Sequence, residues 1–187
     1  IHVPVVAVGC SPEHVDFPGT LTLRESTLEA LLVDVLTSLR RHGFERAFVF
    51  SAHGGNFALL VESRSRLREA ASPMRVGAFT DLTALTARLQ RESVSLGVSP
   101  EAAGHHAGEI ETSILLAIAP EGVRRAALAP GRLEPAADGQ SLFYPSLRPN
   151  APNGTVGDPR PADAARGERY LEAWVGLLVE ACRREFE

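Results

Sequence analysis

The chain has 187 residues, 44% of them hydrophobic, and a mean hydropathy of −0.01, so it can bury a real core and general disorder is a poor interpretation. A formal charge of −4 argues against nucleic acid as the main partner. No apolar run approaches the roughly twenty residues that cross a bilayer, and two cysteines without paired spacing, Cys10 and Cys182, fit a reducing compartment. We therefore expect a cytoplasmic protein that has no membrane partner.

The first segments alternate between strand and helix. Val3–Val8 is a valine-rich run that predicts a buried strand, and a loop rich in Pro and Gly follows it. Ser26-Thr27-Leu28-Glu29 has the spacing of a capping box, and apolar residues then recur at helical period until Gly43. Because residue 1 is not methionine and lies in a strand already under way, we expect the natural chain to begin further upstream.

The alternation continues to the end of the chain. Arg46–Phe50 and Met74–Phe79 predict two further strands, whereas 120–161 predicts loops with one or two edge strands. Helices are predicted over four ranges: 57–71, 82–91, 106–119 and 162 to the end. Strands that alternate with helices indicate an α/β protein with a mostly parallel sheet, and no linker divides residues 1–187 into separate domains.

Polar residues follow the strand at Arg46–Phe50. His53 emerges at the carboxyl end of that strand, where open α/β sheets place ligands. Gly54 and Gly55 leave the backbone uncovered and permit positive φ. Asn56 can cap the next helix or donate an amide hydrogen bond to a bound oxyanion. These four residues alone are equally compatible with a functional site and with an ordinary Gly-Gly turn.

A second polar group precedes the apolar helix at 106–119. If the helix has begun by His106, then His106 and Glu109 share one face and can converge on one ion or water, whereas Glu111 points elsewhere. Burying these acids and histidines beside apolar residues is costly without a cation, which favours a metal or catalytic role. The alternative is that the acids only complement the positive end of the helix dipole.

A third group lies in the loop after the first predicted strand. Glu13 and His14 could contact a substrate or support other site residues, although an isolated Glu-His pair is a weak signal. Phe17-Pro18-Gly19-Thr20 is typical of a rigid turn.

Together, residues 9–14 with 17–20, 53–56 and 106–113 resemble the creatininase (creatinine amidohydrolase) family, and 156–159 resembles the start of its last helix. The resemblance implies a three-layer α/β/α sandwich, two divalent metals, zinc or manganese, and hydrolysis of a small-molecule non-peptide or cyclic amide. It also implies a homo-oligomer, a hexamer in many members. Metal-held water is the nucleophile that such a site supplies.

The resemblance also assigns roles to residues of this chain. His53 and Glu109 are the implied metal ligands, and Glu13, His14 and Asn56 the implied substrate-binding residues. His106 would pass a proton to the leaving nitrogen, and Glu111 would orient its neighbours.

Two departures from the family pattern qualify these roles. Creatininase has a glutamate metal ligand where this chain has Gly55, so Glu109 is assigned as the carboxylate ligand instead. The same change makes the chain resemble the HGGN branch of the family. That branch resembles formamide deformylases and the peptidase-like maturation proteins of a redox peptide. The ExH…D segment that precedes the first strand in the family has no match here, so an N-terminally truncated, metal-poor or inactive subunit is one alternative. A serine esterase is a weaker one, because His53-Gly54-Gly55 resembles an oxyanion-hole motif but no GxSxG sequence occurs.

Overall fold

The structure is a computed structural model that describes residues 1–134 and 139–187. Its contacts form two compact units. The first, here the sheet unit, comprises 1–15, 19–82 and 178–187, and the second, the helical unit, comprises 16–18 and 83–177. The expectation of one domain over 1–187 stays a prediction.

The sheet unit is built on two parallel strands. β1 (Arg46–Val49) and β2 (Arg75–Ala78) pair in register and are connected through α2 (Phe57–Ala71), while α1 (Glu25–Arg41) precedes β1. A parallel pair needs such a helical crossover, because a short turn cannot return the chain to the same edge. Both predicted strands and the helix between them are therefore confirmed.

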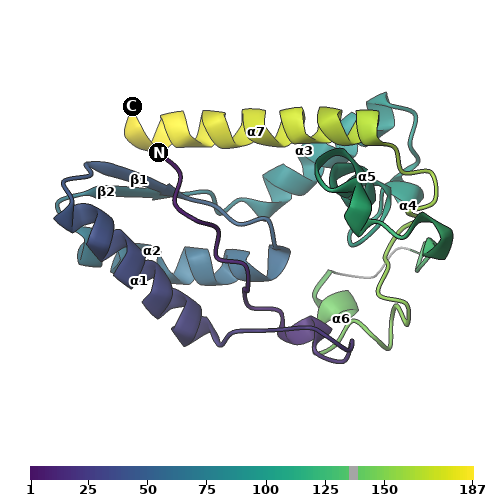
Figure 1. Ribbon diagram of the computed structural model, residues 1–187, viewed down its shortest axis with the longest axis horizontal. Helices are drawn as coiled ribbons and strands as arrows, with labels where there is room; N and C mark the ends of the chain where they lie inside the picture. The colour runs from purple at the N-terminus through teal and green to yellow at the C-terminus, as the bar shows by residue number, and fades with distance from the viewer. Residues whose placement is uncertain (135–138) are drawn as a thin grey trace. The chain divides into compact units, whose positions relative to one another are not determined.

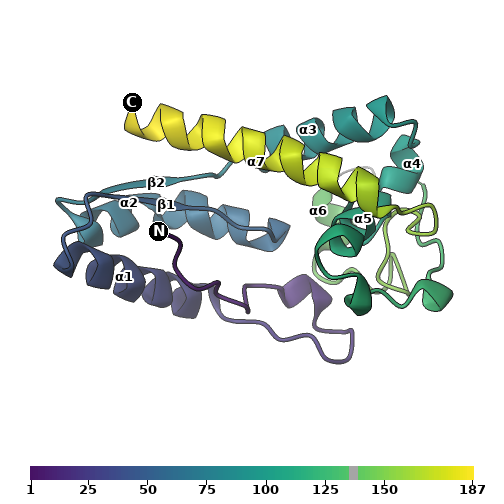
Figure 2. The same ribbon diagram turned by 45° about the horizontal axis from the view of Figure 1, so that its top comes forward.

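Helices cover both faces of this pair of strands. On one face, Val76 packs in a buried core with Leu67 of α2, together with apolar residues of α1. On the other face, the ring of Phe48 meets the ring of Phe186 edge-on at 6.4 Å, at the end of α7 (Ala164–Phe186). Figures 1 and 2 show the strands between α1 and α2 on one side and the end of α7 on the other. The predicted α/β/α layering is confirmed.

The helical unit contains the remaining helices. Its elements are α3 (Leu82–Ser95, from Thr83 on), α4 (Pro100–Ala103), α5 (Glu109–Ile118), α6 (Gly139–Phe143) and α7 as far as Leu177. A core of apolar side chains holds α5 against α7: Val98, Ala103, Ile110, Ile114 and Tyr170. Within the described ranges, no helix is both long and apolar enough to span a bilayer.

Three expectations about the elements were wrong. Val3–Val8 forms no strand, and Val5 is 89% exposed, because a strand needs a neighbouring edge and the valine-rich run has no ladder partner among the described residues. α1 begins one residue before Ser26 and has no side-chain cap. The range 120–161, predicted as loops with one or two edge strands, contains no named strand among its described residues: α6 lies within it, and Val156 makes only isolated bridges, with His106 and Arg132.

Candidate metal centre

A buried carboxylate lies between two imidazoles in the sheet unit. Glu13 stands on a short 3-10 turn and is 3% exposed, and its Oε1 lies 3.2 Å from Nε2 of His14 and 3.2 Å from Nε2 of His53. Its Oε2 is buried and has no hydrogen-bond partner in the described part of the chain. Burying a carboxylate with an unpaired oxygen is costly, so this arrangement favours a bound cation.

The three side chains fit a single divalent cation. One ligand atom from each residue lies within 4.8 Å of the other two. In a tetrahedral zinc site with bonds of roughly 2.0–2.2 Å, neighbouring ligand atoms are about 3.4 Å apart, close to the 3.2 Å separations here. Two histidines and one glutamate are also a ligand set of catalytic zinc sites, which keep one position open for water.

β1 and α2 place His53, as the sequence predicted. The residue follows β1 and precedes the 3-10 turn Gly54–Asn56, which runs directly into α2. Its Nε2 lies 3.1 Å from the Ser11 hydroxyl and 3.0 Å from the Cys10 carbonyl oxygen, besides its contact with Glu13. The side chain is 32% exposed, so a substrate can reach the ring.

Gly55 leaves the space in which the His53 ring contacts Glu13 and the Cys10 carbonyl oxygen. A Cβ on Gly55 would stand 2.5 Å from Nε2 of His53, 2.7 Å from the Cys10 carbonyl oxygen and 3.2 Å from Oε1 of Glu13. Gly54, in contrast, has only a Leu82 methyl group nearby, at 3.8 Å. Neither glycine adopts the positive φ that the sequence permits, and the close approach of His53, Cys10 and Glu13 is what requires a glycine at position 55.

The Asn56 side chain connects the loop that contains Cys10 with the loop after β1 through two hydrogen bonds. Its Oδ1 accepts a hydrogen bond from the Cys10 amide at 2.8 Å, and its Nδ2 donates to the Ser51 hydroxyl at 3.0 Å. The side chain does not cap α2, so the capping role was wrong. Its substrate-binding role stays a prediction, and the bonds observed hold the Glu13 loop beside His53.

The helical unit contains the two predicted catalytic residues, His106 and Glu111. α5 begins at Glu109, and His106 lies before it in an isolated bridge with Val156. The expected helical face shared by His106 and Glu109 is therefore wrong, because the chain at His106 pairs as an extended segment. Nδ1 of His106 still lies 3.9 Å from Oε2 of Glu111, and that oxygen accepts the Ala107 amide at 2.6 Å.

Glu109 has protein partners on both carboxylate oxygens. It is fully buried, and Oε1 accepts hydrogen bonds from Ser113 at 2.8 Å and Arg166 at 2.7 Å, while Oε2 accepts one from Tyr170 at 2.7 Å. The hydrogen bond to Glu109 raises the pKa of Arg166, and burial followed by the same carboxylate raises the pKa of Tyr170. A metal-ligand role for Glu109 stays a prediction and would require it to give up at least one of these donors.

The sequence singled out these polar segments, but it did not identify every partner of their side chains. Glu13 and His14 lie beside His53 in the structure, and their predicted substrate-binding role stays a prediction. The sequence analysis did not identify Arg166 and Tyr170 as the partners of Glu109. These two residues are four positions apart on the last helix, a spacing that places both side chains on one face.

Known proteins share both the sequence and the fold. The Creatininase family, described as creatinine amidohydrolase, matches residues 1–182. A mycofactocin precursor peptide peptidase of Mycolicibacterium smegmatis is 31% identical over 97% of this chain and 66% of its own length, and a creatinine amidohydrolase of Pseudomonas putida is 29% identical over 91% and 67%. A solved structure named creatininase Mn aligns with a TM-score of 0.68 at 26% identity over 91% of this chain and 68% of its own. The chain spans about two thirds of the length of these relatives.

Proposed function

The chain belongs to the creatininase family, and from this premise we propose that it hydrolyses the C–N bond of a non-peptide or cyclic amide, or of a formamide, with the help of a divalent metal. One observation carries the proposal: the buried carboxylate of Glu13 lies 3.2 Å from the Nε2 atoms of both His14 and His53 and has an unpaired second oxygen. The manganese in the name of the aligned creatininase supports a divalent metal, and zinc suits the same ligands.

In this proposal the protein binds the metal and moves protons. Glu13, His14 and His53 would hold a zinc or manganese ion, which would lower the pKa of a bound water to near neutrality and polarise the substrate carbonyl. His106 passes a proton to the leaving nitrogen, and Glu111 orients His106 through the 3.9 Å contact between their side chains. An amine leaves far more readily when protonated, so loss of His106 should slow turnover.

The substrate is a small molecule in this proposal, and a peptide-derived amide is the second candidate. The peptide peptidase from Mycolicibacterium smegmatis supports the second candidate, because it matches 97% of this chain at 31% identity. Gly55 is consistent with that branch, since it leaves the position two residues after His53 without a carboxylate. A panel of formamides, cyclic amides and short peptides would separate these substrate classes.

The geometry disfavours a serine hydrolase. In a catalytic triad the nucleophile and the acid bind different nitrogens of the imidazole. Here the Ser11 hydroxyl and Oε1 of Glu13 both lie beside Nε2 of His53, at 3.1 and 3.2 Å. Ser11 is therefore a poor nucleophile. A catalytically inactive subunit remains the alternative that metal analysis would identify.

A chelation experiment tests the proposed function. Hydrolysis should be lost when the protein is dialysed against a strong chelator and should return when zinc or manganese is added. His53→Ala should remove both activity and bound metal, whereas His42→Ala, an exposed histidine at the end of α1, should leave both unchanged. Turnover that persists in metal-free protein would contradict the proposal.

We further propose that the protein works as a cytoplasmic homo-oligomer, by its resemblance to the family. Light scattering on the eluting protein gives the subunit number directly. A hexamer is the expected result, and a monomer at micromolar concentration would contradict this part of the proposal.

A further inference from the structure

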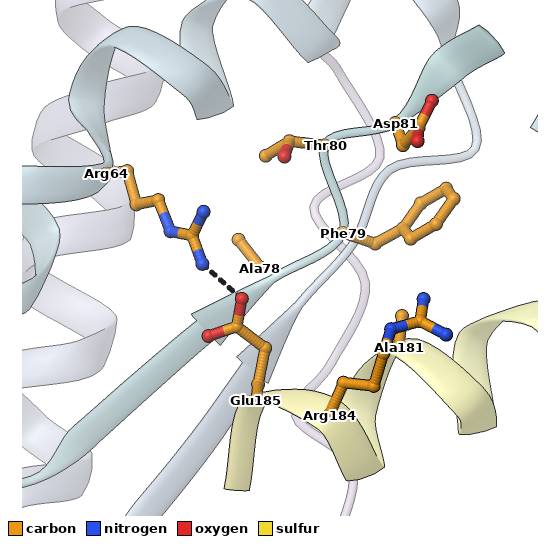
Figure 3. Close-up of a pocket in the computed structure, with 8 residues that line it drawn as sticks. All are labelled: Arg64, Ala78, Phe79, Thr80, Asp81, Ala181, Arg184 and Glu185. Carbon is orange, nitrogen blue, oxygen red and sulfur yellow. Dashed lines mark hydrogen bonds and ion pairs between the residues drawn. The ribbon is translucent and has the colours of Figure 1, made fainter. Parts of the chain in front are cut away.

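A small pocket outside the metal centre lies entirely within the sheet unit. It has a volume of about 170 Å³ and is formed by α2, the end of β2 and the last turns of α7 (Figure 3). Its polar lining comes from Arg64, Thr80, Asp81, Arg184 and Glu185. Since a water occupies roughly 30 Å³ of liquid, the pocket has room for a ligand of a few non-hydrogen atoms.

The lining of the pocket holds two arginines and two acids, and arginines already pair with one of these acids. The carboxylate of Glu185 is an ion-pair partner of both Arg64 and Arg68, and Arg75 donates to the Glu185 carbonyl at 2.8 Å. Arg184 has no ion pair among the described residues. The Glu185 carboxylate is therefore neutralised by the guanidinium groups of Arg64 and Arg68. Asp81, the other acid, directs its carboxylate away from Arg64 in Figure 3.

The pocket also contains donors without acceptors. Nε of Arg64 is buried and has no hydrogen-bond partner in the part of the chain that the structure describes. The Thr80 hydroxyl has none there either. A buried, charged N–H group without an acceptor is costly, and a ligand oxygen would remove that cost. The exposed Arg184 leaves the pocket open to solvent, so a small ion can enter.

From these observations we propose that the pocket binds a small oxyanion, a phosphate or a short carboxylate, between Arg64 and Arg184, with Thr80 as a further donor. Planar guanidinium groups match the geometry of carboxylate and phosphate oxygens better than an ammonium does. The volume of about 170 Å³ suits an ion or a small metabolite. The site does not depend on the proposed hydrolysis, because none of its lining residues belongs to the metal centre.

Titration calorimetry with inorganic phosphate and with acetate, at constant ionic strength, tests the site. Wild type should bind at least one of the two saturably, and Arg184→Gln should weaken that binding about tenfold or more, which is the usual effect of losing a charge-assisted contact. Arg183→Gln, an exposed neighbour that does not line the pocket, is the matched control and should bind as wild type does. Tighter binding of acetate than of phosphate would identify a carboxylate ligand, and the reverse a phosphate.

Arg64→Lys provides a second variant that keeps the charge beside Glu185 while removing the planar donor group, and it should weaken binding as well. Circular dichroism verifies that each variant is folded. Saturable binding of neither ion to wild type would overturn the proposal. Equal weakening in Arg184→Gln and Arg183→Gln would also overturn it, because such a result indicates non-specific attraction.

Discussion

Substitution of Gly55 by alanine should disrupt the metal centre, whereas the same substitution at Gly54 should not. The new methyl group at 55 would lie 2.5 Å from Nε2 of His53 and 2.7 Å from the Cys10 carbonyl oxygen. Ordinary separations are about 3.5 Å, so these groups must move apart by roughly 1 Å. Metal ligands tolerate only about 0.2 Å, and the same methyl group at Gly54 meets a single atom, at 3.8 Å.

The two variants therefore differ in one measurable property. We expect Gly55→Ala to bind zinc about 10–100-fold more weakly, as with other displaced ligands, and to lose about 1–3 kcal/mol of unfolding free energy through overpacking. Gly54→Ala should have the zinc affinity and the unfolding free energy of wild type. Competition with a chromophoric chelator gives the affinities, and urea denaturation gives the free energies. Equal zinc affinity in the two variants would show that His53 and Glu13 do not bind the metal together.

Three further outcomes are expected. Glu109→Gln should lower the unfolding free energy by about 2–4 kcal/mol in urea titrations, because it leaves Arg166 without its buried, charged partner. Loss of metal from the folded variant would instead support the predicted ligand role of Glu109. Glu111→Ala should lower turnover about 10–100-fold with metal content unchanged, since the contact of Glu111 with His106 is lost; unchanged turnover would remove Glu111 from the mechanism. Burial raises the pKa of Cys10, so its thiol should react more slowly with a disulfide reagent than the partly exposed Cys182, and equal rates in single-cysteine variants would contradict the buried position.

The parts of the fold that local pattern determines could be predicted from the sequence. α2 and both strands follow from apolar periodicity and from the Gly-rich turn after β1, and the long final helix follows from a single apolar stripe. Val3–Val8 could not be predicted correctly in the same way. Its composition favours a strand, but whether a strand forms depends on an available sheet edge, which is a property of the whole fold.

The candidate site shows the same limit. The polar segments could be identified from their composition. Which of their side chains contact one another depends on the three-dimensional fold, which sequence spacing does not encode. Glu13 is forty residues from His53 in sequence and shares its Nε2 atom in space. Glu109, which looked equally suited to a metal, accepts three hydrogen bonds from its own unit. A carboxylate near histidines in the sequence is therefore a weaker sign of a metal site than a buried carboxylate oxygen without a hydrogen-bond partner, such as Oε2 of Glu13.

The metal content of the purified protein, measured by elemental analysis beside that of Glu13→Gln, tests the central claim most directly. Gln keeps the size of Glu13 but loses the charge that two imidazoles surround. Wild type should hold close to one equivalent or more of zinc or manganese per chain, and Glu13→Gln should lose most of it while remaining folded. Wild-type protein that takes up no metal, or a Glu13→Gln variant that retains the wild-type amount, would contradict a metal centre built on Glu13, His14 and His53.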